Sequence, residues 1–560
     1  MTMFKPIEMT FSSRRSPVLS RRGMIAASQP LAVAAGLEIL SKGGNAADAA
    51  IAVAAALNVT EPTSTGIGGD CFALYYDAAH HKISALNGSG RAPQTLTLDK
   101  IRREGLIDSE GELPPFHPYT ITVPGACAGW FDLISAYGRL PMTEILAPAI
   151  RLAEEGFPVA PTTAYFWQHG VESRLRHAAG GLELTLDGRA PHPGEIFRNP
   201  GLAQTFRTIA EHGKQAFYQG EIAQAIINTV KLAGGCISED DLANHTSTWE
   251  SPISIDYHGY QVWECPPNGQ GLAALLGLNI LEGFDLSDLP PLSLPRLHLE
   301  IEAMRLAFAD ARWYVADPAF SPAPLDELLS KAYAAQRRKL INPEKAVLTQ
   351  TFGVPTSSSD TVYFCTVDGY GNACSFINSN YMGFGTGIVP SGWGFTLHNR
   401  GHNFSLDPDH PNALMPGKRP YHTIIPGMIT HGKNPRANEN TQADQYDFYA
   451  VFGVMGGFMQ PQGHLQVVSA LLDDQVDPQT VVDLPRFCIE EGRAGGKVAL
   501  EQDIPDEVCN SLESMGHPIR KVSGYERTLF GRGQMIVRDS YSKVLWGGSD
   551  PRADGCAMGL

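Results

Sequence analysis

Thr361 is the residue of this sequence with the most specific potential for chemistry. It follows a small polar loop, 351–360, that ends at Asp360, and it begins the strand-like run Thr-Val-Tyr-Phe-Cys-Thr-Val. A threonine hydroxyl is a poor nucleophile at neutral pH unless a base lies beside it. Cutting the peptide bond before Thr361 would supply that base, because the freed α-amine has a pKa of about 7.7–8.0 and can take the hydroxyl proton. On composition alone, Thr361 could also be no more than the first residue of a strand.

The strand that Thr361 begins is predicted to form a hairpin. Residues 362–367 are β-branched, aromatic or small and apolar, and 369–372, Gly-Tyr-Gly-Asn, then supply a turn before a second strand at 373–377. We interpret the abrupt start of the first strand as the start of a new chain. The loop 351–360 would then have to move away after self-cleavage between Asp360 and Thr361.

Composition and charge restrict the partners of the chain. At 560 residues it can bury a large core, and with 43% hydrophobic and 18% charged residues it is typical of a folded protein. The formal net charge of −16 argues against nucleic acid or an anionic membrane as a general partner, because its field repels both. A small molecule or a protein is the expected substrate.

The cysteines and the N-terminal region favour a cytoplasmic location over a periplasmic or secreted one. Nine cysteines with no C-x-x-C pair are typical of buried thiols in a reducing compartment. Two arginines precede an apolar stretch near residue 23, as in a secretory or twin-arginine signal, but Ser28-Gln29-Pro30 interrupts that stretch. No stretch reaches the roughly 18 apolar residues of a membrane span.

Periodicity predicts helices and strands in alternation, which favours a layered α+β body. Two helices are expected within 30–58, broken at Gly43-Gly44, with Asn45 as N-cap of the second. Further helices are predicted at 125–136, 143–155, 202–212, 222–233, 270–282 and 295–313, and strands near 71–77, 259–265, 361–377, 424–430, 448–453 and 534–546. A surface insertion is expected at 431–446.

Other familiar sites fit less well. The segment 269–274, Gly-Gln-Gly-Leu-Ala-Ala, matches G-x-G-x-x-A between a strand and a helix and is followed by Asp285, as in dinucleotide-binding oxidoreductases. However, 266–268, Pro-Pro-Asn, separates strand and glycines, and no parallel-sheet pattern surrounds them. His398 and His402 are a weak candidate for a metal pair, because no glutamate accompanies them. The G-x-S-x-G nucleophile elbow is absent.

Several long motifs in order resemble the γ-glutamyltranspeptidase family of N-terminal nucleophile hydrolases. The resemblance runs from about residue 20 to the C-terminus, and its motifs lie at 43–70, 361–373, 383–389, 411–420 and 453–457. It implies a four-layer αββα sandwich made as one precursor. Self-cleavage would give a large subunit, 1–360, and a small subunit, 361–560, that stay associated as an αβ heterodimer, which could pair further.

The resemblance also assigns catalytic roles. Thr361 corresponds to the family nucleophile, and Ser379 to a second threonine that hydrogen-bonds the amine of the nucleophile. Gly456 and Gly457 correspond to a turn whose backbone N–H groups stabilise the tetrahedral oxyanion, which suits glycine because the backbone must approach the reacting carbon closely.

The substrate pocket departs from family members that handle glutathione. Ser89 stands where they hold the α-carboxylate with an arginine, with Arg91 two residues on, and Arg400 replaces a glutamine. Their acidic residue for the α-amine becomes Asn403, so the expected anion is missing and a cation has been added. The other substitutions are His422-Thr423 for a serine pair and Tyr381 for an asparagine. These changes favour a carboxylate without an ammonium, although a solvated Arg400 is an alternative.

We therefore predict a self-processing threonine amidohydrolase of the acylase-like or oxamate amidohydrolase-like branch. Its substrate would be a small carboxylate-bearing amide such as oxamate or a glutaryl amide, with acyl transfer as an additional capacity and without a cofactor or metal. The alternative is γ-glutamyl transfer or glutathione hydrolysis. From other classes, an uncleaved binding protein and a dinucleotide oxidoreductase stay open.

Overall fold

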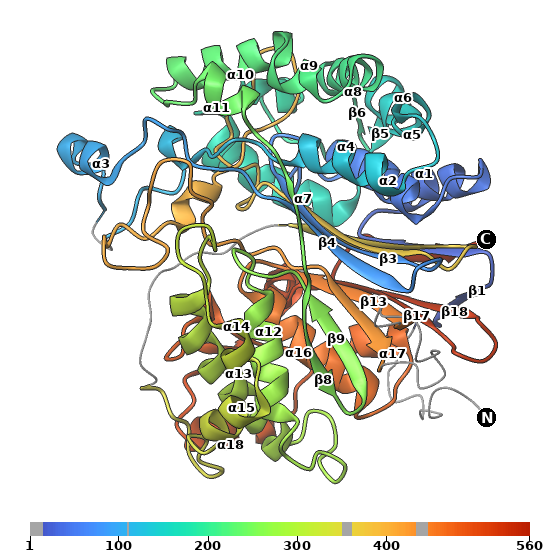
Figure 1. Cartoon of the computed structure of the whole chain (residues 1–560), viewed down its shortest axis with the longest axis vertical. Helices are drawn as coiled ribbons and strands as arrows, with labels where there is room; N and C mark the ends of the chain where they lie inside the picture. The colour runs from blue at the N-terminus through green and yellow to red at the C-terminus, as the bar shows by residue number, and fades with distance from the viewer. Residues whose placement is uncertain (1–14, 109–110, 350–360, 433–445) are drawn as a thin grey trace.

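The computed structural model describes residues 15–108, 111–349, 361–432 and 446–560. Two seven-stranded sheets lie face to face and helices cover their outer faces, so the layers follow in the order helix, sheet, sheet, helix (Figure 1). The predicted α+β sandwich of αββα type is confirmed. The predicted loop 351–360, Asp360 included, lies outside the described residues, as does most of 431–446.

Both sheets are antiparallel throughout, and each is named here by a central strand. The β13 sheet has the order β1 (Val18–Ser20), β18 (Leu545–Ser549), β17 (Arg532–Arg538), β13 (Asp447–Met455), β12 (Gly427–His431), β9 (Tyr260–Glu264), β8 (Ile253–Tyr257). The β10 sheet has the order β19 (Cys556–Gly559), β2 (Gly23–Ala27), β10 (Val362–Asp368), β11 (Ala373–Ser379), β3 (Asp70–Asp77), β4 (Lys82–Gly88), β7 (Thr248–Glu250).

The predicted hairpin and the predicted N-cap are both present. Strands β10 and β11 pair from Val362 opposite Asn378 to Val367 opposite Ala373. The second predicted helix, α2 (Ala46–Thr60), is buried along its whole length, as its nearly uniform apolar composition requires. Asn45 Oδ1 accepts hydrogen bonds from the backbone N–H groups of Ala47 and Asp48, and the Asp48 side chain accepts from the Asn45 N–H, which completes a capping box.

Helices of the two outer layers differ in which part of the chain supplies them. Over the β10 sheet lie α1 (Pro30–Ser41), α2 and α4 (Ala126–Tyr137), and over the β13 sheet α12 (Gly271–Leu281), α13 (Leu294–Tyr314) and α16 (Met459–Leu472) (Figure 1). The remaining helices are α3 (Leu98–Glu104), α5 (Met142–Ile145), α6 (Ala147–Glu155), α7 (Pro161–Gly170), α8 (Pro200–His212), α9 (Gln215–Tyr218), α10 (Glu221–Leu232), α11 (Glu239–Ala243), α14 (Leu325–Leu328), α15 (Lys331–Arg338), α17 (Pro478–Asp483) and α18 (Asp506–Ser514). None of the helices in the described ranges is long and apolar enough to cross a bilayer.

Three predicted elements differ in extent. The helix predicted at 143–155 is two helices, α5 and α6, and Pro148 lies in the first turn of the second, where its missing N–H costs nothing. The strand predicted at 534–546 is the hairpin β17–β18. The strand predicted at 424–430 starts only at Gly427, directly after Pro426. Small additional strands are β5 (Phe157–Pro158), β6 (Ile196–Phe197), β14 (Phe487–Ile489), β15 (Val498–Glu501) and β16 (Ile519–Val522).

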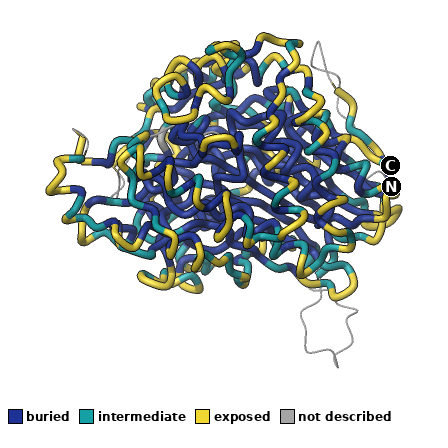
Figure 2. The backbone as a smooth tube through the Cα atoms, turned by 90° about the horizontal axis from the view of Figure 1, so that it is seen from above, coloured by how far each residue is buried: buried dark blue, intermediate teal, exposed yellow. Residues whose placement is uncertain are grey.

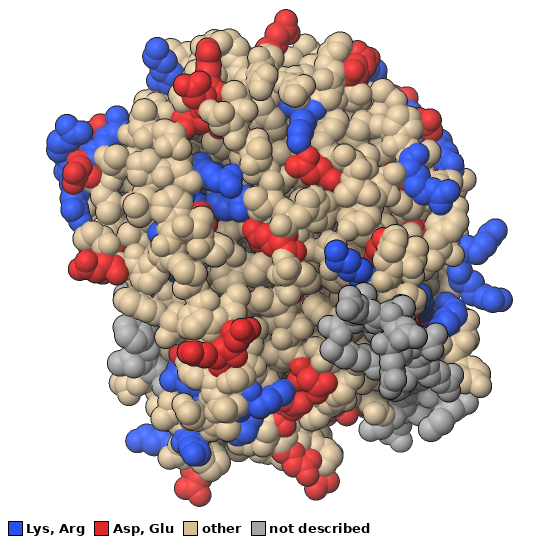
Figure 3. Space-filling model, viewed as in Figure 1, with Lys and Arg blue, Asp and Glu red and all other residues tan. Residues whose placement is uncertain are grey.

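The core follows the two-residue period of the strands. On β13, Val451 and Met455 belong to the apolar cluster shared with the β10 sheet, whereas Phe452 and Val454 belong to the cluster under α12 and α13. Buried residues fill the middle of the molecule and exposed residues form its rim (Figure 2). On the face seen in Figure 3, acidic and basic side chains are scattered among uncharged ones, so the net charge does not gather in one patch there.

Both sheets combine strands from before and after residue 361. Strand β2 lies between β19 and β10, and β3 pairs with β11; in the other sheet β1 pairs with β18, and β9 with β12. The apolar stretch compared above with a signal sequence contains β2, which is buried at every residue. A cut before Thr361 would therefore leave two interleaved pieces, as the predicted subunits 1–360 and 361–560 require.

Candidate active site

Three polar residues lie side by side at the ends of three adjacent strands of the β10 sheet. Ser379, the last residue of β11, is paired with Asp70, the first residue of β3. One step beyond the Val362–Asn378 pair, Thr361 lies opposite Ser379, and their hydroxyl oxygens are 3.1 Å apart. All three side chains are fully buried.

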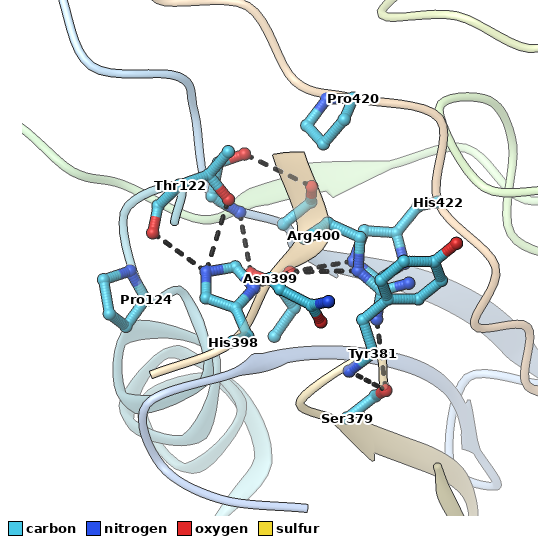
Figure 4. A network of polar contacts seen from close by, with 12 residues as sticks. Thr122, Pro124, Ser379, Tyr381, His398, Asn399, Arg400, Pro420 and His422 are labelled. Carbon is cyan, nitrogen blue, oxygen red and sulfur yellow. Dashed lines mark hydrogen bonds and ion pairs between the residues drawn. The ribbon is translucent and has the colours of Figure 1, made fainter. Parts of the chain in front are cut away.

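Ser379 receives two hydrogen bonds that decide what its hydroxyl can do. The backbone N–H of Tyr381 donates to Ser379 Oγ at 2.8 Å, and Arg400 Nη2 donates to it at 3.1 Å (Figure 4). A hydroxyl oxygen has two lone pairs, and these two donors occupy both. The Ser379 hydroxyl is therefore left as a donor, with Thr361 Oγ1 within reach, and a donor directed there would stabilise negative charge on the threonine oxygen.

Arg400 is buried among the other predicted site residues, so the alternative of a solvated Arg400 is wrong. Its Nη1 donates to Thr423 Oγ1 at 2.7 Å, its Nε lies 3.6 Å from Asp70 Oδ2, and its guanidinium carbon lies 4.5 Å from the centre of the Tyr381 ring. Burial lowers the pKa of Arg400 to about 10, against the opposing pull of Asp70. Arg400 is therefore a cation at neutral pH.

Asp70 supplies an anion that the sequence analysis held to be missing. Its Oδ1 accepts a hydrogen bond from the Gly90 N–H at 2.9 Å, and its Oδ2 lies 3.0 Å from His422 Nε2 and 3.1 Å from His398 Nδ1. Burial raises the pKa of Asp70, but the two histidines outweigh it and hold that pKa well below its usual range. The signal in the sequence was an acidic residue, in Gly-Gly-Asp, directly before the predicted strand 71–77.

The histidines orient this carboxylate. Burial, with the nearby charge of Arg400, lowers the pKa of His422 to about 3, so its ring is neutral, donating from Nε2 to Asp70 and accepting at Nδ1 from the Ile424 N–H at 3.4 Å. His398 places its Nε2 2.8 Å from the carbonyl oxygen of Thr122 (Figure 4). His402 instead faces the Leu113 carbonyl, and no cluster of metal-ligand residues occurs in the described ranges.

Tyr381 and Asn403 present a donor rather than an acceptor. The Tyr381 hydroxyl donates to Asn403 Oδ1 at 2.6 Å, while Asn403 Nδ2 is buried and has no hydrogen-bond partner in the described part of the chain. Tyr381 has a φ of 74°, a left-handed conformation that is uncommon for non-glycine residues. Asn403, which was predicted to replace the acidic residue of relatives, therefore has its side-chain oxygen hydrogen-bonded to Tyr381. Its N–H₂ group has no hydrogen-bond partner among the described residues.

Gly456 and Gly457 form a tight turn between β13 and α16. Their φ angles of 133° and 57° lie in the region that favours glycine. The Gly456 carbonyl accepts from the Met459 N–H at 2.9 Å, and the Gly457 carbonyl accepts from Gln270 Nε2 at 2.9 Å. The same Nε2 donates to the Thr423 carbonyl at 2.6 Å. An unbroken line of hydrogen bonds thus joins, in order, Thr361, Ser379, Arg400, Thr423, Gln270 and Gly457.

Two predicted pocket residues lie away from this line. Ser89 Oγ accepts from Asn268 Nδ2 at 3.1 Å, one residue before Gly90, which binds Asp70. Arg91 is partly exposed and donates to the Thr246 carbonyl at 3.1 Å. The structure therefore does not bring Arg91 to Thr361 through any contact among the described residues.

The dinucleotide fingerprint lacks its structural context. Strand β9 pairs with β8 and β12 in antiparallel fashion, whereas the motif requires a parallel βαβ unit. Asp285 is exposed and accepts from Ser287 rather than standing near the glycines. Within the segment 269–274, the Gln270 side chain instead binds the carbonyls of Thr423 and Gly457.

The chain is similar to known proteins over nearly its whole length. The family model for gamma-glutamyltranspeptidase matches residues 32–560. The glutathione hydrolase-like YwrD proenzyme of Bacillus subtilis is 36% identical over 97% of this chain and 99% of its own length, and the oxamate amidohydrolase proenzyme of Klebsiella pneumoniae is 32% identical over 97% and 99%. The crystal structure of cephalosporin acylase from Bacillus halodurans superposes with a TM-score of 0.88 at 46% identity, covering 100% of this chain and 99% of that one.

The buried Asp70–Arg400 pair generates a prediction about stability. Asp70→Asn leaves the Arg400 cation without its counter-charge, so it should lower the free energy of unfolding by about 3–5 kcal/mol. The double variant Asp70→Asn/Arg400→Gln removes both charges and should cost less than the two single changes together. Unfolding midpoints by calorimetry measure the effect, with the exposed Asp285→Asn as control; additive losses in the double variant would contradict the pairing.

Proposed function

Since the chain belongs to the gamma-glutamyltranspeptidase family of N-terminal nucleophile hydrolases and is an enzyme acting on amides, we propose that Thr361 is its nucleophile. Self-cleavage after Asp360 would create the free amine. The observation that carries the proposal is the buried contact of Thr361 Oγ1 with Ser379 Oγ, itself held by Arg400. Through Ser379, the proposed nucleophile is thus connected to Arg400, a cation that can bind an anionic group of the substrate.

The reaction follows from these groups. The Thr361 oxygen attacks the amide carbon while the α-amine takes the hydroxyl proton, and the N–H groups of Gly456 and Gly457 stabilise the oxyanion. The amine then passes that proton to the leaving nitrogen as the C–N bond breaks, leaving an ester on Thr361. Water attacks the ester, the α-amine takes a proton from it, and the acid leaves as the Thr361 oxygen recovers a proton.

The substrate class follows from the donors around Thr361. Arg400 has five N–H groups, of which one on each terminal nitrogen is used by Thr423 and Ser379, so that each terminal nitrogen keeps one for a ligand. The N–H₂ group of Asn403 adds further donors. Donors of this kind suit the carboxylate of a small amide such as oxamate or a glutaryl amide. The relatives named oxamate amidohydrolase and cephalosporin acylase support this class.

Glutathione hydrolysis is the second candidate, because several relatives are named as glutathione hydrolase or glutathione hydrolase-like. A γ-glutamyl group carries an ammonium that needs acceptors. The Asn403 oxygen is engaged by Tyr381, and Asp70 is engaged by two histidines and Gly90. We therefore rank this activity below the hydrolysis of amides that lack an ammonium.

We also propose a cytoplasmic location for the enzyme. All nine cysteines are free thiols and seven of them are buried. Such unpaired thiols suit a reducing compartment.

The relatives named as proenzymes support a precursor that is cut into two associated subunits.

The first prediction of the proposed function concerns processing. The wild type should give two bands on a denaturing gel, with the shorter piece starting at Thr361, and Thr361→Ala should give one uncut band without amidase activity. Thr361→Ser keeps a hydroxyl and should still be cut. N-terminal sequencing of the short fragment checks the position, and an active, intact wild type would falsify the mechanism.

The second prediction concerns Arg400. Arg400→Gln should raise KM at least about 10-fold for glutaryl-p-nitroanilide, because a charged hydrogen bond of about 1.5–3 kcal/mol is lost. The KM for acetyl-p-nitroanilide, which has no carboxylate, should change less than about threefold. Released ammonia from oxamate and released glutamate from glutathione extend the panel. Equal KM changes for both anilides would remove Arg400 from substrate binding.

The third prediction concerns pH. The rate constant kcat/KM should rise as the Thr361 α-amine loses its proton, around its reference pKa of about 7.7–8.0. Burial lowers the pKa of Arg400 to about 10, so Arg400 is charged below that pH and loses its charge above it. KM for the glutaryl anilide should therefore increase above about pH 10, while KM for the acetyl anilide stays flat. A parallel increase for both would point to unfolding instead.

A further inference from the structure

Gln270 is a buried residue of the Gly-Gln-Gly segment for which the proposed reaction has no role. It precedes α12 and occupies the N-cap position, yet its side chain makes no hydrogen bond to that helix. Its side chain is fully buried. Burying a carboxamide is unfavourable unless its donors and acceptor find partners elsewhere, so those partners indicate what the side chain does.

All of these partners come from two segments of the C-terminal piece. Gln270 Nε2 donates to the carbonyl of Thr423 at 2.6 Å and to the carbonyl of Gly457 at 2.9 Å. Its Oε1 accepts from the Tyr421 hydroxyl at 2.9 Å. Its backbone N–H donates to the His422 carbonyl at 3.0 Å. One side chain from before residue 361 thus fastens two segments that follow it.

The two fastened segments carry different parts of the site. Thr423 accepts a hydrogen bond from Nη1 of Arg400. These two residues form the acyl wall, the side of the site that would receive the acyl group. Gly457 belongs to the turn whose N–H groups would face the oxyanion, and the Gly457 carbonyl also accepts from the Gln460 N–H at 3.2 Å, in the first turn of α16. A donor that binds both carbonyls fixes the distance between the acyl wall and the oxyanion turn.

We propose that Gln270 is a positioning residue that holds the oxyanion turn, Gly456–Gly457, at a fixed distance from the acyl wall. The inference rests on the proposed function, because it gives the turn and the wall their roles. The energetic reason is that a displacement of about 1 Å in a site of this kind can cost on the order of 100-fold in rate. An oxyanion donor contributes only if it already lies at the position that the oxyanion will occupy.

Two substitutions test the proposal with glutaryl-p-nitroanilide as substrate. Gln270→Leu keeps most of the volume and removes both donors, and Gln270→Glu places an oxygen against the two carbonyl oxygens. Each should lower kcat roughly 10- to 100-fold and change KM less than threefold. Rates are normalised to the cleaved fraction on a denaturing gel.

A tetrahedral probe separates positioning from general loss of structure. 4-Boronobutanoic acid has the glutaryl skeleton with boron at the acyl carbon, and its tetrahedral adduct with a hydroxyl uses the oxyanion turn; glutarate uses only the acyl wall. The boronate should lose affinity in proportion to kcat in the Gln270 variants, whereas glutarate should keep its affinity within threefold. Equal losses for both ligands would overturn the proposal.

The matched control is Gln479→Leu. Gln479 is a buried glutamine of α17 whose carboxamide likewise binds backbone, at Ser549 of β18, a strand of the β13 sheet. Its substitution should leave kcat within twofold. Gln270 variants that behave like this control would overturn the inference while an active wild type upholds the proposed function. A wild type that releases neither p-nitroaniline nor ammonia from oxamate would contradict both.

A milder variant covers the case in which Gln270→Leu is not cleaved. Tyr421→Phe removes only the hydroxyl that orients the Gln270 carboxamide and leaves both donors in place. It should give a smaller fall in kcat, of about two- to fivefold, with unchanged glutarate affinity. Wild-type kcat in Tyr421→Phe, together with an uncleaved Gln270→Leu, would assign Gln270 to folding and overturn the proposal.

Discussion

The pairing register of β3, β11 and β10 is the constraint on which the site depends. This register places three residues in one row across the strands: Asp70, Ser379 and Thr361. Both faces of the strands are buried, and this burial fixes the register. A slip of one residue would exchange the two faces of a strand and turn Thr361 away from Ser379. The helices above and the β13 sheet below fill those faces with apolar side chains, so the core holds the catalytic row in place.

Charge is the second constraint, because the anion of the row, Asp70, lies beside the buried cation Arg400. Two charges taken out of water are costly unless hydrogen bonds satisfy them. Asp70 finds Gly90, His398 and His422, and Arg400 finds Thr423 and Ser379. These partners bind the pair to three further segments of the chain, at Gly90, Ser379 and 422–423. Arg400 is therefore fixed before any ligand arrives, which lowers the entropy lost on binding.

The sequence allowed local features to be predicted better than long-range contacts. The hairpin after Thr361 and the Asn45 cap depend on neighbours within a few residues and were predicted correctly. The pairing register that brings Ser379 opposite Thr361 was not part of that prediction and comes from the structure. Asp70 and Gln270 were missed because their partners lie about 150 to 350 residues away, a separation at which only the folded sheets determine contact.

Self-cleavage is compatible with this fold because a strand does not need the covalent bond that precedes it. Strand β10 is hydrogen-bonded to β2 on one side and β11 on the other, and β2 comes from the other piece. A chain end created at Thr361 would therefore keep its place through pairing alone. The same interleaving explains how a side chain of the large piece, Gln270, can fix segments of the small one. A cut would free the amine that the chemistry needs while the contacts that locate Thr361 remain.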